Sequence, residues 1–140
     1  MQEAADAHLT FDLTIAAARA VGHPGLRFCY VSGEGADSSE RGRTMWARVK
    51  GKTENALLRL PLQAFMFRPG FIRPLRGAPS RTPITRAFCT VMAPLYPLLQ
   101  RLAPRHVTTT AHIGRAMIQV AQSGYSARVL ETPDINLLGA

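Results

Sequence analysis

Apolar residues recur at helical spacing in three parts of the chain. Residues 9–20, 44–60 and 108–121 each place apolar side chains three and four positions apart, which is the pattern of a helix with one buried face. We therefore predict three helices. The positions expected to face the core are Leu9, Leu13, Ala16, Ala17 and Ala20 in the first, Trp46, Val49, Thr53, Ala56, Leu57 and Leu60 in the second, and Ile113, Ala116, Met117 and Val120 in the third.

Glycine and proline mark where these helices end. Gly22 follows the first, Pro61 the second and Gly124 the third, and Thr110 is the expected N-cap of the third. Gly51 lies inside the second helix, where glycine costs up to about 1 kcal/mol relative to alanine.

Short apolar runs between the helices are typical of strands. Residues 26–31 and 64–67 are bounded by turn-forming residues and are expected to be buried strands, and residues 127–130 a last strand. Strand, helix and strand form the βαβ unit of a parallel sheet. The pattern predicts an α/β fold over residues 1–140 as a single domain, with a loop at residues 32–42 between the first strand and the second helix.

The stretch from residue 68 to 102 is harder to interpret. Residues 68–83 read as loop, and residues 84–102 as a helix that Pro94 and Pro97 must kink or split. Arginines stand at both ends of that helix, so it could lie on a membrane surface, pack as a substrate lid or bury against a partner. All three interpretations stay open.

Composition and charge narrow the function classes. The formal net charge is +8, but the arginines are scattered and no nucleic-acid-binding motif accompanies them, so nucleic-acid binding is not expected. No apolar run approaches the length of about 20 residues that spans a membrane. The polar start resembles neither a secretory signal nor a transit peptide. Cys29 and Cys89 lie in apolar stretches, which predicts buried, reduced thiols in a cytoplasmic protein.

The residues that carry candidate chemistry lie around the first two strands. Ser32 follows the first strand, Trp46 and Lys50 lie four apart on the next helix, and Arg68-Pro69-Gly70 follows the second strand. The carboxyl ends of parallel strands meet at one edge of the sheet, where open α/β folds bind ligands. Residues four apart on a helix share a face, so positions 46 and 50 can serve the same site.

This arrangement resembles the second half of a short-chain dehydrogenase/reductase of the extended, epimerase-like kind. The resemblance covers roughly residues 9–135 and implies a partial Rossmann-like NAD(P)-binding fold. It implies that Ser32 is the catalytic serine that orients the substrate. It gives Lys50 a catalytic role and a hold on the cofactor ribose, and it places Arg68, Pro69 and Gly70 beside the nicotinamide.

Two departures from the family pattern change the expected activity. The catalytic tyrosine position holds Trp46, whose indole cannot shuttle a proton as a phenol does. Tyr30 is near in sequence, but its place on a strand makes it a poor substitute. The glycine-rich phosphate loop is absent, because Gly33-Glu34-Gly35 precedes a polar loop and lacks the third glycine. The first four strands of the family are therefore expected to be missing, leaving an apolar edge on the strand at 26–31.

The sequence thus predicts an N-terminally incomplete NAD(P)-dependent epimerase/dehydratase-like protein that binds NAD or NADP weakly and is weak or inactive alone. The alternative is a non-enzymatic assembly or membrane-surface binding module derived from that fold. Partners could be a second copy of the chain or a missing N-terminal half, and the small-molecule substrate is not identified. A plain structural role for each site residue also stays open. No metal is expected, since the four histidines lack metal-ligand spacing.

Overall fold

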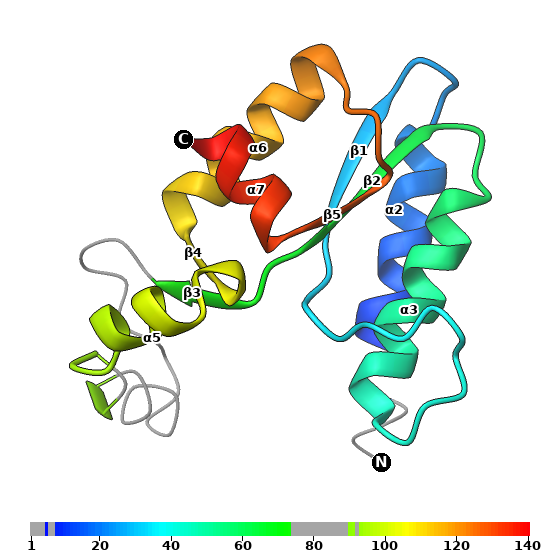
Figure 1. Cartoon of the computed structure of the whole chain (residues 1–140). Helices are drawn as coiled ribbons and strands as arrows, with labels where there is room; N and C mark the ends of the chain where they lie inside the picture. Colours follow the sequence, from blue (N-terminus) through cyan, green and yellow to red (C-terminus); the bar gives the residue numbers. More distant parts are fainter. Residues whose placement is uncertain (1–4, 6–7, 74–89, 92) are drawn as a thin grey trace.

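The computed structural model of the chain describes residue 5 and residues 8–73, 90–91 and 93–140 (Figure 1). None of the helices in these ranges is both long enough and apolar enough to cross a membrane. The elements named in this structure are, in chain order, η1 (His8–Asp12), α2 (Leu13–Val21), β1 (Arg27–Val31), α3 (Met45–Leu58), β2 (Gln63–Arg68), β3 (Phe71–Arg73), α5 (Tyr96–Leu102), η2 (Pro104–His106), β4 (Val107–Thr109), α6 (Thr110–Ser123), β5 (Val129–Glu131) and α7 (Thr132–Gly139).

A parallel sheet of three strands in the order β1-β2-β5 forms the centre of the molecule. Helices α2 and α3 lie on one side of it and α6 and α7 on the other, giving three layers (Figure 1). The predicted α/β class is confirmed, and so is the βαβ unit, because β1 and β2 pair in parallel on either side of α3 in the sequence.

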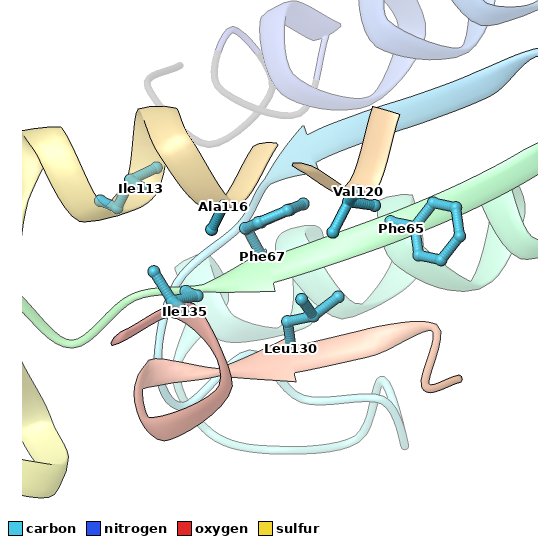
Figure 2. Packing of buried hydrophobic residues seen from close by; sticks show 7 residues of the cluster. All are labelled: Phe65, Phe67, Ile113, Ala116, Val120, Leu130 and Ile135. Atoms are coloured by element: carbon cyan, nitrogen blue, oxygen red, sulfur yellow. The ribbon is translucent and has the colours of Figure 1, made fainter. Parts of the chain in front are cut away.

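The central strand β2 divides its side chains between two cores. Ala64 and Met66 pack with residues of α2 and α3, while Phe65 and Phe67 pack with Ile113, Ala116, Val120, Leu130 and Ile135 (Figure 2). Successive residues of a strand point to opposite faces, so both faces must be covered for such a run to be stable. Burying each of these phenylalanines contributes about 2–3 kcal/mol.

The buried face predicted for the first helix is wrong. Ile15 and Ala18 face the core, and Phe11 packs partly against it, whereas Leu9, Leu13, Ala16, Ala17 and Ala20 are exposed. The helix is apolar on nearly all sides, so the periodicity does not select a face. The larger side chains of Phe11 and Ile15 fill the space above β2 instead.

The second and third predicted helices are confirmed with small corrections. In α3, Thr53 and Leu57 are buried as expected, but Trp46 is 44% exposed. In α6, Ile113, Ala116 and Val120 are buried and Gly124 ends the helix with a φ of +73°. The N-cap is Thr109 rather than Thr110, since the Thr109 hydroxyl accepts a hydrogen bond from the His112 amide at 3.1 Å.

A second, two-stranded parallel sheet pairs β3 with β4, and the sequence did not predict it. Strand β3 lies in the stretch predicted as loop, and β4 covers the start of the third predicted helix. Helix α7 was not predicted either. Of the predicted helix at 84–102, residues 84–89 and 92 lie outside the described residues. Pro94 lies in a turn before α5 begins at Tyr96, whereas Pro97 is accommodated in the first turn of α5.

Strand β1 is at the edge of the main sheet and is half-buried rather than buried. Ser32 N–H donates to Phe67 C=O, and Leu26 C=O accepts from Gln63, so even-numbered residues bond to β2. The backbone groups of Arg27, Cys29 and Val31 therefore point to the open side. Cys29 is a free, half-buried thiol whose pKa is raised by burial, and Cys89 lies outside the described residues.

Candidate functional site

A hollow of about 470 Å³ opens where the carboxyl ends of β1 and β2 meet the second sheet. Small-molecule sites in proteins commonly measure about 300–1,000 Å³, so this volume suits a small ligand or one part of a larger one. The residues around it come from the loop after β1, from α3, from the turn after β2 and from β3. They are Val31, Ser32, Gly33, Glu34, Gly35, Trp46, Pro69, Gly70 and Ile72.

Ser32 is one of the residues that line the hollow. Its backbone N–H continues the β1–β2 ladder with a 2.8 Å bond to Phe67 C=O. Its hydroxyl is buried and has no hydrogen-bond partner among the described residues. A buried hydroxyl without a partner costs about 1–3 kcal/mol.

Trp46 forms one wall of the hollow. A Cβ at Gly33 would approach the Trp46 ring to 2.7 Å, so the absence of a side chain at Gly33 lets the indole lie against the backbone of the β1 loop. Although the indole is large and apolar, much of it faces solvent at the hollow. The indole is thus a partly exposed wall of the hollow rather than core packing.

Lys50 lies beside the end of β1 but does not line the hollow. Its Nζ is 3.2 Å from the Tyr30 hydroxyl, 5.0 Å from the centre of that ring and 3.5 Å from the Val31 carbonyl oxygen. The ammonium therefore contacts the residue just before Ser32. The structure brings the two predicted site residues to the same end of β1, with Tyr30 in contact with the lysine.

Arg68 is held by carboxylates of the protein. Its Nε and Nη2 donate to the two oxygens of Glu54 at 3.0 and 2.5 Å, and Nη1 reaches Glu131 at 3.5 Å. Glu54 is 1% exposed, and its hydrogen bond and charge raise the pKa of Arg68. Arg68 does not line the hollow. Its side chain instead links β2 to α3 through Glu54 and to β5 through Glu131.

Pro69 and Gly70 form the floor between the two sheets. Glu34 N–H donates to Pro69 C=O at 3.0 Å, and Gly70 N–H donates to the Thr132 hydroxyl at 2.9 Å. A Cβ at Gly70 would collide with the Glu34 carboxylate and the His106 carbonyl. Glycine is required here because three segments converge on its Cα.

The sequence did not indicate the contact between Glu34 and His106. The His106 Nδ1 meets a Glu34 carboxylate oxygen, which joins the loop after β1 to η2, 72 positions along the chain. Both side chains are partly exposed, and Glu34 lines the hollow. No short-range pattern signals such a pair. Only the position of Glu34 just after a strand end could have drawn attention to it.

The arrangement can bind more readily than it can transfer protons. Within the described ranges, no cluster of three metal-ligating side chains exists. The hollow offers an indole face and backbone groups, which suit a flat polar ring. A phosphate would meet the Glu34 carboxylate, and Arg68 is already paired. The lining thus suits a flat ring better than a phosphate.

Comparison with known proteins adds no assignment, since no protein-family model matches the chain and no curated protein matches its sequence.

Proposed function

We propose that this chain carries the substrate-side half of a Rossmann-like NAD(P)-binding domain of the epimerase/dehydratase-like group. In this proposal the hollow holds the nicotinamide and its ribose. NAD or NADP, when bound, supplies the hydride chemistry that gives such proteins their oxidoreductase activity.

The observation that carries the proposal is the meeting of three features at one edge of the main sheet. The unpartnered Ser32 hydroxyl, the Lys50 ammonium and the Pro69-Gly70 floor lie at the carboxyl ends of β1 and β2. That edge is where open α/β sheets bind ligands. Ser32 orients the substrate and Lys50 turns from Tyr30 to the ribose hydroxyls, while Trp46 packs on the bound ring.

The proposal also limits the activity. Trp46 donates an N–H but does not ionise near neutral pH, so it cannot act as the acid or base. The 140 residues contain no glycine-rich phosphate loop. Because phosphate contacts supply much of dinucleotide affinity, we expect these residues alone to bind NADH with a Kd of about 1 mM or weaker.

Trp46 is the chain's single tryptophan, so its fluorescence can test this binding. Titration with NADH or NADPH is expected to quench it weakly, and both Ser32→Ala and Lys50→Met are expected to weaken the effect further. Lys52→Met is the matched control, since Lys52 lies on the same helix over the Phe11 ring. Equal loss in Lys50→Met and Lys52→Met would contradict the proposed site. Micromolar binding by the unmodified chain would contradict the weak-affinity proposal.

A further inference from the structure

Helix α5 and Leu95, the residue before it, present a row of leucines that nothing in the described chain covers. Leu95, Leu98 and Leu102 are 42%, 52% and 74% exposed, and their spacing of three and four places them on one helical face. Val91, four residues earlier, is exposed as well. We call Leu95, Leu98 and Leu102 the α5 stripe.

The opposite side of α5 fixes this orientation. Tyr96 is buried, its ring centre lies 6.4 Å from that of Phe71, and the Arg73 guanidinium lies 4.5 Å from the same ring. These contacts tie the helix to β3 through its inner face. The α5 stripe therefore lies off this inner face and is exposed. Helix α5 itself lies at one end of the molecule, away from α2 and α3 (Figure 1).

Two arginines flank the stripe. Arg101 and Arg105 are exposed on or just after α5. Such a surface attracts a polyanion, and exposed leucines in its middle gain nothing from a nucleic acid, whose backbone is hydrated. An anionic bilayer offers both a negative surface and an apolar layer beneath it.

We propose that the α5 stripe and its flanking arginines dock the protein on an anionic lipid surface. The leucines enter the boundary between headgroups and acyl chains, and Arg101 and Arg105 contact the lipid phosphates. This inference does not depend on the proposed nicotinamide site, because none of these residues lines the hollow.

Co-sedimentation of the full chain with vesicles tests the proposal. We expect binding to vesicles containing about 30% phosphatidylglycerol to be at least tenfold tighter than to pure phosphatidylcholine, and to weaken with salt. Leu98→Gln/Leu102→Gln should lower it about tenfold or more. Arg101→Gln/Arg105→Gln should remove most of the preference for phosphatidylglycerol.

Ile118→Gln/Leu137→Gln is the matched control, because these two side chains are 60% and 72% exposed but lie on α6 and α7. It should bind like the unmodified chain. In a Trp46→Phe/Leu102→Trp variant, vesicles should shift the tryptophan emission to the blue. Circular dichroism of each variant verifies folding.

Two results would overturn the proposal. One is vesicle binding that survives Leu98→Gln/Leu102→Gln in a folded variant. The other is a stable oligomer of the unmodified chain in size-exclusion chromatography that this double variant converts to a monomer, since the stripe would then bind a second copy of the chain.

Discussion

The ion pair between Arg68 and Glu54 is the residue-scale feature with the largest expected effect on stability. Glu54 is almost fully buried on α3, and the Arg68 side chain, on β2, is 14% exposed. Two hydrogen bonds align the guanidinium with the carboxylate, and a third donates from Arg68 to the Ser38 hydroxyl at 2.7 Å. The resemblance implies a cofactor-binding role for Arg68, and that role stays a prediction.

Removing one partner of a buried pair leaves the other charge without compensation, which costs about 3–5 kcal/mol. We expect Arg68→Met to lower the free energy of unfolding by about 3 kcal/mol, at the low end because the arginine reaches solvent. Urea denaturation measures this loss. Arg43→Met, at an exposed site, should change it by about 0.5 kcal/mol or less. Similar losses in the two variants would show that the pair contributes little.

At the scale of elements, close backbone packing explains why α3 contains a glycine. Gly51 is buried in the helix, and a Cβ there would overlap the backbone carbonyl of Asp37 in the loop after β1. The loop can therefore lie directly on the helix, which holds Ser32 and Trp46 at one hollow. This contact requires glycine at position 51 despite the low helix propensity of glycine.

Two glycine-to-alanine substitutions should consequently have opposite signs. Gly51→Ala should lower the free energy of unfolding by about 2 kcal/mol or more, because the loop must move. Gly114→Ala in α6 should raise the free energy of unfolding by about 0.5–1 kcal/mol. A Cβ added at this position would have no atom within 4 Å, and alanine has a higher helix propensity than glycine. Thermal unfolding of both variants checks the pair. Stabilisation by Gly51→Ala would contradict the close packing.

The elements that could be predicted are those whose apolar pattern contrasts with polar flanks. Strand β2, helix α3 and helix α6 have such contrast and were found near their predicted bounds. Strands β3 and β4 have three residues each and pair only with one another, so no periodicity marks them. For α2, apolar residues surround the helix, and only the shape of the core decides which are buried.

The candidate site could be predicted as far as it depends on strand ends. Ser32, Pro69 and Gly70 follow strands that end at one edge, so parallel pairing alone brings them together. The contacts of Lys50 with Tyr30 and of Glu34 with His106 depend on side-chain directions and on distant segments. No spacing rule contains that information.

At the scale of the whole molecule, the main sheet has a buried central strand and, on its β1 side, an unpaired edge that we call the border of the sheet. Strand β2 is paired on both sides and packed on both faces, while β1 is paired on one side only. In the described part of the chain, the outward amides of Arg27, Cys29 and Val31 have no strand beside them. The Lys50 ammonium contacts the Val31 carbonyl at that border.

Hydrogen exchange followed by NMR should show this asymmetry. Amides of β2 are expected to exchange most slowly, because they open only with the core. Along β1, Tyr30 and Ser32 should be protected, while Arg27, Cys29 and Val31 should exchange much faster. Equal protection of Cys29 and Tyr30 would mean that the border is covered in solution.

The position of Lys50 links the border of the sheet to the occupancy of the hollow. If the ammonium turns to a ribose, as proposed, it leaves the Val31 carbonyl. The edge of β1 then loses a charge that hinders its pairing with a strand of another chain. The Lys50 ammonium can then either bind the ligand or hinder self-association, but it cannot do both at once. The ligand-bound protein would accordingly self-associate more readily than the ligand-free protein.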